Sequence, residues 1–273
     1  MARASATKTR SSAATSRRSG GELNYSGAAV LSFRRLACFP LPEGGLTMTN
    51  LGFDLLTTGC WHGRTCFVVG SGPSLRFFDF KRLDGALSIG VNRAFEFFSP
   101  RVLLALDARF YERVLDGTYG PESREKFNAY EGIKVGVRIC QKYIEGVREI
   151  RSLGAGGPIV PVEQGLYHGN NSGYSAVALA LALGANPVYV MGIDLRYAGP
   201  AEAQVTHNHN GHPEKTPEKD LISKCLPHFV CLSRMIEGRR VKVFNPDWPQ
   251  EPFSRLADFF EVVPPSDKKF MEV

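Results

Sequence analysis

Short runs of β-branched and other apolar residues alternate with helix-forming segments from residue 60 onward. Runs of this length, bounded by glycine or polar residues, are typical of buried strands. The predicted strands cover residues 66–70, 86–92, 102–106, 134–139, 188–193 and 241–244. Strands that alternate with helices predict an α/β fold of the Rossmann-like, doubly wound type, with a mostly parallel sheet and helices on both faces.

The clearest predicted helix covers residues 172–184. Asn170, Asn171 or Ser172 can cap its start, alanine and leucine fill it, and Gly184 ends it. Further helices are predicted near 221–237 and 253–260. The intervening segment from 196 to about 219 is a polar loop with three histidines. A loop that long inside a compact domain is more often functional than incidental, so it is a candidate part of a site.

Charge divides the chain unevenly. Residues 1–47 contain seven Lys or Arg and two Glu, whereas the remaining 226 residues hold 26 basic and 25 acidic groups. We expect residues 1–47 to be a disordered basic tail, a transit-like segment, or an extension ahead of a true start at Met48, and residues 48–273 to form a single Rossmann-like domain. Because the folded part is nearly neutral and lacks a basic helix with interleaved aromatics, the sequence argues against nucleic-acid binding.

The cysteines and the apolar runs indicate the compartment. The six cysteines form no CxxC pair and no short zinc-ligand spacing, which predicts reduced thiols in a cytoplasmic protein. The longest apolar run, residues 176–183, is far shorter than the roughly 20 residues of a membrane span. We therefore expect a soluble protein with no membrane partner.

A glycine-rich loop follows the first predicted strand, with the order Gly70, Ser71, Gly72, Pro73, Ser74. Glycines at such a position let backbone amides approach a phosphate, and a serine adds a hydroxyl donor. The loop lacks the Gly-Lys-Ser/Thr of a P-loop, and Leu75 stands where a complete GxGxxG has its third glycine. A nucleotide-binding loop and a purely structural tight turn both remain open.

Polar residues stand at the carboxyl ends of three predicted strands, namely Asn92, Asp107 and Asp194. Ligands of open α/β sheets bind outside those ends, so the three predict one site assembled by the topology. The turn Asn171-Ser172-Gly173 precedes the clearest helix and can offer amides to an anion. Each residue taken singly is equally explained as a turn residue or a helix cap.

Three histidines, His207, His209 and His212, lie in the long loop with the spacing His-x-His-x-x-His. Such spacing can bind a metal, although dense zinc sites usually recruit a carboxylate or cysteine as well. A histidine in a loop can also act as a general base or contact phosphate. Metal binding, base or phosphate contact, and plain exposure are three hypotheses that the sequence leaves open.

Several of these segments together resemble a known family. Val-Val-Gly-Ser-Gly-Pro-Ser-Leu at 68–75, Ile-Gly-Val-Asn-Arg at 89–93, Asp107, and the stretch 171–195 resemble the 6-hydroxymethylpterin diphosphokinase-like (MptE-like) family. The same order is similar to that of bacterial sialyltransferases that use a CMP-sugar, which share a Gly-x-Gly-Pro-Ser-Leu loop and a Ser-Gly helix start. The resemblance covers residues 64 to about 260, and residues 110–165 match neither group.

The resemblance implies a nucleotide-dependent transferase that holds its nucleotide with the glycine-rich loop, Asn92 and the 171–173 turn. On the diphosphokinase hypothesis, which we take first, Mg-ATP lies on the loop, and Asp107 and Asp194 act in catalysis as Mg²⁺ ligands. The hydroxyl of a hydroxymethylpterin-type acceptor then attacks the β-phosphorus and displaces AMP. Magnesium would offset the charge that develops on the phosphate oxygens.

Two alternatives to the diphosphokinase hypothesis remain open. On the glycosyltransferase hypothesis the same loop holds CMP, no metal is needed, and His212 in Gly-His-Pro resembles the Gly-His that carries the catalytic base. Those enzymes place tyrosines against the leaving phosphate, and here only Tyr197 stands between Asp194 and His207. The other alternative is an accessory protein that binds a nucleotide without turnover, since fold does not settle function.

Overall fold

The computed structural model describes residues 56–138, 143–200, 203–209, 215–236, 238, 240–247 and 250–271. The predicted basic tail, residues 1–47, lies outside the described residues, and so does His212. Within the described part, none of the helices has the length and apolarity that a membrane span requires.

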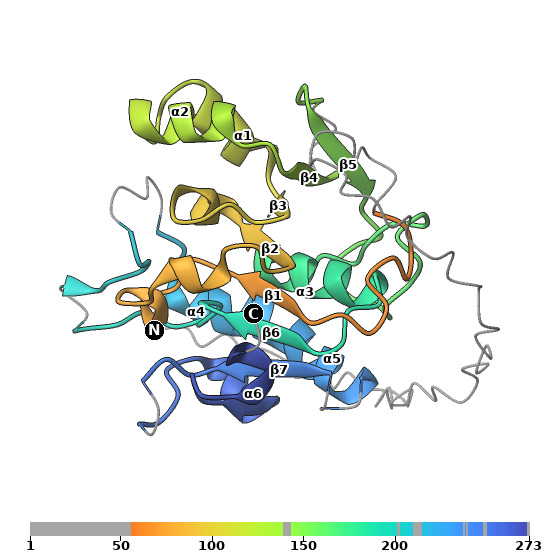
Figure 1. Ribbon diagram of the computed structural model, residues 1–273, viewed down its shortest axis with the longest axis vertical. Coiled ribbons are helices and arrows are strands. Elements are labelled where there is room, and N and C mark those ends of the chain that lie inside the picture. The colour runs from red at the N-terminus through yellow and green to blue at the C-terminus, as the bar shows by residue number, and fades with distance from the viewer. Residues whose placement is uncertain are drawn as a thin grey trace, which may run out of the picture. The chain divides into compact units, whose positions relative to one another are not determined.

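One parallel sheet organises the described residues (Figure 1). Its spatial order is β5-β4-β3-β2-β1-β6-β7-β8, and every neighbouring pair is parallel. The strands are β1 Cys66–Val69, β2 Ser88–Val91, β3 Val102–Ala105, β4 Ile133–Arg138, β5 Val147–Arg151, β6 Val188–Met191, β7 Val241–Phe244 and β8 Glu261–Val263. The α/β, Rossmann-like, doubly wound architecture expected from the alternating pattern is confirmed.

Both faces of the sheet are buried because successive strand residues point to opposite sides. In β1, Cys66 and Val68 belong to one hydrophobic cluster, whereas Phe67 and Val69 belong to another. Helices α3 Ser172–Ala182 and α5 Leu226–Met235 contribute to the first cluster. Helices α1 Ala108–Leu115, α2 Pro121–Ala129 and α6 Lys268–Met271 contribute to the clusters on the opposite face. Continuous apolar strands therefore follow from a sheet covered on both sides.

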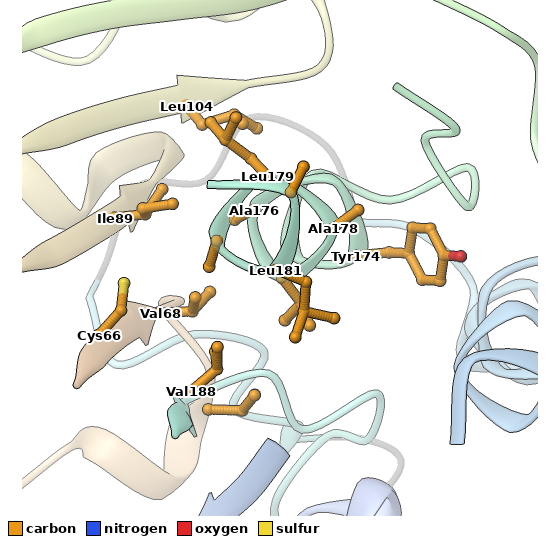
Figure 2. Close-up of a cluster of buried hydrophobic side chains, with 14 of the residues drawn as sticks. Cys66, Val68, Ile89, Leu104, Tyr174, Ala176, Ala178, Leu179, Leu181 and Val188 are labelled. Carbon is orange, nitrogen blue, oxygen red and sulfur yellow. The ribbon is translucent and has the colours of Figure 1, made fainter. Parts of the chain in front are cut away.

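Helix α3 is the centre of the larger cluster. Its residues from Gly173 to Ala182 are all buried, and Leu179 and Ala176 face the strands that carry Val68, Ile89 and Leu104 (Figure 2). Small alanines let the helix lie close to the strands, while the leucines fill the space between them. Gly184, with a φ of +89°, ends the helix as the sequence predicts. This packing fixes the position of the helix N-terminus over the sheet.

The remaining predicted helices differ from the structure in form. The segment predicted near 221–237 is a composite of α4 Glu218–Asp220, a π-helical turn Leu221–Cys225, and α5. The segment predicted near 253–260 holds only a short 3-10 turn, Arg255–Asp258. Further 3-10 turns cover Pro73–Leu75, Phe80–Leu83 and Asn92–Glu96. Each of these turns follows a strand or connects two strands, where short links favour a single tight turn.

Candidate functional site

The strand order reverses direction next to β1. Chain progression runs from β1 outward through β2 to β5, and then resumes on the other side of β1 with β6. Such a reversal opens a crevice outside the carboxyl ends of the strands. A cavity of about 440 Å³ lies there, lined by the segments that follow β1, β2, β3 and β6 and by the start of α3. We call it the switch-point cavity.

The structure brings most of the predicted site residues to this cavity. Those that line it are Gly70, Ser71, Gly72, Pro73, Asn92, Asp107, Asn171, Ser172, Gly173 and Asp194. Ser74, by contrast, borders a neighbouring groove on the far side of the loop. His207 and His209 line the cavity too, whereas the position of His212 is outside the described residues.

The glycine-rich loop is fixed against the end of β6. A Cβ atom at Gly70 would lie 2.3 Å from the Gly192 carbonyl oxygen, and one at Gly72 would lie 2.3 Å from Asp194 Oδ2. The Gly70 and Gly72 amides donate hydrogen bonds to the carbonyls of Met191 and Gly192. Contact between the loop and the β6 exit therefore requires both glycines, whether or not a ligand is bound.

Asp194 holds the glycine-rich loop through hydrogen bonds to Ser74. Its carboxylate accepts hydrogen bonds from the Ser74 amide at 2.9 Å and from Ser74 Oγ at 2.7 Å, and the residue is only 3% exposed. Burial raises its pKa to about 6, the bonds from Ser74 and the charge of Arg196 oppose the rise, and Asp247 adds to it. The geometry makes Asp194 a clasp between two strand ends, which we call the Asp194–Ser74 clasp.

Asp107 caps helix α1. Its Oδ1 accepts from the Arg109 amide at 2.9 Å, and its Oδ2 forms an ion pair with the Arg109 guanidinium. Burial acts to raise its pKa, but the bonds and charge of Arg109 outweigh it and hold the pKa below its ordinary value. The carboxylate is thus ionised, with its two oxygens directed to Arg109.

The start of α3 is tied to β3. Ser172 Oγ accepts a hydrogen bond from the Leu106 amide at 3.0 Å, and Asn171 Oδ1 caps the helix by accepting from the Tyr174 amide. The amides of Ser172 and Gly173 come before the first intrahelical bond, so they are the groups that an anion can take. The buried, well-packed helix directs its positive end into the cavity.

Unusual backbone conformations gather at this cavity. Among the described residues, the non-glycine residues with positive φ are Asn92 at +52°, Asn170 at +53° and Leu195 at +51°, and all three line it. Asparagine tolerates this conformation, but it is a true outlier for leucine. Strained backbone persists where surrounding structure holds it in place and is concentrated at ligand sites. This coincidence marks the switch-point cavity independently of any sequence motif.

Four arginines to which the sequence assigns no role also line the cavity: Arg93, Arg109, Arg113 and Arg196. Arg93 is buried and pairs with Glu96 at 2.6 Å. Arg109 and Arg113 stand four residues apart on α1, and therefore on one helical face. These four arginines outnumber the acidic residues that line the cavity or pair with them, which are Asp107, Asp194 and Glu96, so the excess of positive charge is small. The spacing of 109 and 113 would have been visible had the helix over 108–115 been predicted.

The two described loop histidines lie side by side, with ring centroids 5.0 Å apart. His209 Nδ1 lies 3.2 Å from the Arg93 guanidinium. Because a guanidinium only donates, this Nδ1 must accept, which leaves the proton on Nε2. In this orientation His209 Nε2–H is available as a donor. The loop is anchored nearby, since the Asn208 amide donates to the Ser71 carbonyl at 2.8 Å.

The predicted magnesium ligands, Asp107 and Asp194, are both engaged in bonds within the protein. The described residues contain no cluster of three or more His, Cys, Asp or Glu suited to a metal ion. The Asp194 carboxylate is occupied by Ser74 and that of Asp107 by Arg109. A magnesium site made by these two residues remains a prediction that their present bonding does not favour.

Comparisons with known proteins add little to this picture. No protein-family model matches the chain, and no curated protein matches it. A solved structure, the MAf glycosyltransferase from Magnetospirillum magneticum AMB-1, is similar with a TM-score of 0.45 and 16% identity. The match covers 77% of this chain, which spans only 35% of that protein. The resemblance to the MptE-like family is not supported by these comparisons, and the site must be interpreted from its own geometry.

Proposed function

We propose that the protein is a glycosyltransferase-type transferase whose donor is a nucleotide-linked sugar, with a CMP-sugar as the first choice. One observation carries the proposal: four arginines and the N-terminus of α3 converge on the switch-point cavity. Arginine guanidinium groups and helix amides are the groups that bind phosphate in proteins. They supply positive charge that needs no bound metal to stabilise a nucleotide leaving group.

The proposed reaction follows from that arrangement. The oxygen of an acceptor hydroxyl attacks the anomeric carbon of the donor sugar and forms the new C–O bond. The bond from that carbon to the phosphate oxygen breaks, and the nucleotide leaves with the electron pair. The arginines and the amides of Ser172 and Gly173 stabilise the charge on the departing phosphate. The acceptor proton passes to a base in the same step.

A loop histidine is the natural base. His209 presents an N–H toward its surroundings, because Arg93 occupies its other nitrogen, so it suits donation to the leaving phosphate. His207 lines the cavity beside it, and His212 lies five residues further along the loop. We propose His207 or His212 as the acceptor of the proton. Diphosphate transfer from Mg-ATP, the first sequence-based hypothesis, lacks comparable support from the carboxylates.

The experiment is a thermal unfolding series on the purified full-length chain with CMP, CMP-sialic acid, CTP and ATP, each with magnesium and with EDTA. A ligand present at 100 times its dissociation constant stabilises the folded state by about 2.7 kcal/mol. We expect CMP and CMP-sialic acid each to stabilise the folded protein, and each to do so by the same amount with magnesium as with EDTA. Chromatographic detection of released CMP then tests for slow hydrolysis of the donor.

The other outcomes separate the hypotheses. Stabilisation by ATP alone and only with magnesium would overturn glycosyl transfer and restore the diphosphokinase hypothesis. CMP binding with no release of CMP from the donor would favour an accessory, non-catalytic protein. Stabilisation by none of the four ligands would remove cytidine nucleotides and ATP from the site.

A further inference from the structure

A second concavity, of about 580 Å³, lies on the other side of the glycine-rich loop. It is lined by residues that follow the carboxyl ends of β1, β6, β7 and β8. The switch-point cavity lies at the ends of β1, β2, β3 and β6, and this second concavity lies at the ends of β1, β6, β7 and β8. We call it the aromatic groove. Its volume falls in the range of small-molecule binding sites.

The groove and the switch-point cavity share their boundary. Pro73 lines both, and Ser74, on the groove side, is bonded to Asp194, on the cavity side. At a second point Arg196, a cavity residue, places its guanidinium 5.5 Å from the ring centre of Phe253, a groove residue. Molecules bound in the two spaces would therefore be neighbours, separated by a thin wall.

The walls of the groove carry aromatic rings. Phe78 and Phe244 meet edge to face at 5.5 Å and form part of its lining. Phe77 is 91% exposed, which is exceptional for a phenylalanine in the described residues. Arg76 lies 5.5 Å from the centre of the Phe77 ring. An exposed ring at the edge of a concave surface offers a flat apolar face to a ligand.

The polar groups of the groove balance one another. Arg76 and Arg82 supply only donors, while Asp79 and Asp247 supply only acceptors. A strongly charged ligand would meet repulsion from one of the two pairs. A neutral ring with several hydroxyls satisfies both, because each hydroxyl donates and accepts, and its apolar face can cover an aromatic ring. Pyranose sugars have this combination of faces.

We propose that the aromatic groove binds the acceptor of the transfer reaction, and that this acceptor presents a neutral carbohydrate ring. The assignment as acceptor rests on the proposed function, since a donor in the switch-point cavity leaves this adjoining space for the second substrate. The carbohydrate chemistry rests on the groove alone. Phe77 covers the apolar face of the ring, and Asp247 and Arg76 bind its hydroxyls.

The test is saturation-transfer NMR on the full-length chain, with and without CMP. The probes are the methyl glycosides of galactose, glucose, N-acetylglucosamine and mannose, and glycerol is the control that has hydroxyls but no ring face. We expect at least one glycoside to give ring-proton signals and glycerol to give none. The variant Phe77→Ala should lose most of that signal, and Asp247→Asn should reduce it several-fold.

A matched variant, Tyr143→Ala, removes another exposed aromatic ring, one that lines neither space. It should bind the glycoside as the unmodified protein does. Absence of glycoside binding, or equal binding by Phe77→Ala, would overturn the inference. Nucleotide stabilisation is recorded on the same samples. Its presence without glycoside binding would leave the proposed donor site standing, and the reverse result would keep the carbohydrate groove while removing the donor site.

Discussion

Two walls of the switch-point cavity are built differently. One, the clasped wall, consists of the glycine-rich loop, Asp194 and the start of α3, and its polar groups are bonded to one another. The other, the arginine wall, consists of Arg93, Arg109, Arg113 and Arg196 and brings charge to the space. Residues to which the sequence assigns a role thus form the frame, and arginines, of which only Arg93 lies in a quoted motif, carry the positive charge of the cavity. Substitutions in the two walls should therefore have different effects.

The largest effect is expected in the clasped wall for Gly72→Ala. The added Cβ would lie 2.3 Å from Asp194 Oδ2 and 2.7 Å from the Gly192 carbonyl oxygen, and backbone atoms cannot move aside freely. Overpacking of this kind costs about 3 kcal/mol of the unfolding free energy. Urea denaturation measures it. Gly238→Ala, where a Cβ meets nothing within 4 Å, is the matched control. A stable Gly72→Ala protein would mean that the loop is not held against β6.

A pH dependence of similar size is expected from Asp194. Its folded pKa of about 6 lies above the ordinary value of 3.8 because burial disfavours the charged form. The folded state therefore favours the protonated carboxyl. This preference adds fully to the unfolding free energy below about pH 4, and the contribution is lost as the pH rises through about 6. A gap of about two pKa units corresponds to about 3 kcal/mol.

The measurement compares the unfolding free energies of the unmodified protein and Asp194→Asn at several values between pH 4 and pH 7. The amide at position 194 of the variant cannot ionise. Between pH 4 and pH 7 the unfolding free energy of the variant should therefore rise by about 3 kcal/mol relative to that of the unmodified protein. Asp79→Asn removes a carboxylate from the exposed side of the same loop region and serves as the control. A difference between the two proteins that stays constant with pH would contradict a buried, ionising clasp.

The smallest effect is expected in the arginine wall, where Arg113→Gln should leave stability nearly unchanged. Removal of one charge from the cavity should raise the dissociation constant of CMP by about five- to tenfold, or about 1 kcal/mol. Calorimetric titration measures the affinity, and denaturation of the same sample measures stability. Arg234→Gln, on α5 and outside the cavity, is the matched control. If Arg113→Gln kept its affinity for CMP but lost stability, the arginine wall would have the same structural role as the clasped wall, which contradicts the comparison.

Much of the sheet could be predicted from sequence because its central strands are buried on both faces. The expected strand at 241–244 coincides with β7, and the expected helix from 172 coincides with the start of α3. The edge strands β5 and β8 were missed. In β5 only Val147 and Ile150 are buried, so its sequence, Val-Arg-Glu-Ile-Arg, shows neither a continuous apolar run nor a strict alternation.

The site could be predicted only in part, for a related reason. Motif residues cluster along the sequence, which is why the glycine-rich loop and the 171–173 turn were found. Arg93 and Arg196 lie 103 positions apart, and no local pattern connects them. The strained conformation of Leu195 likewise has no signature in its side chain. Features that depend on how distant segments meet become visible only when the sheet has been assembled.

The clasp between Ser74 and Asp194 joins residues 120 positions apart in the chain. It cannot form during synthesis until β6 has emerged and paired with β1, by which time β1 to β5 have already been made. Long-range pairing of this kind closes late, since the entropy of the intervening chain opposes it. The switch-point cavity is thus among the last parts of the domain to form. A ligand that needs it stabilises only finished molecules and gives no help to partly folded ones.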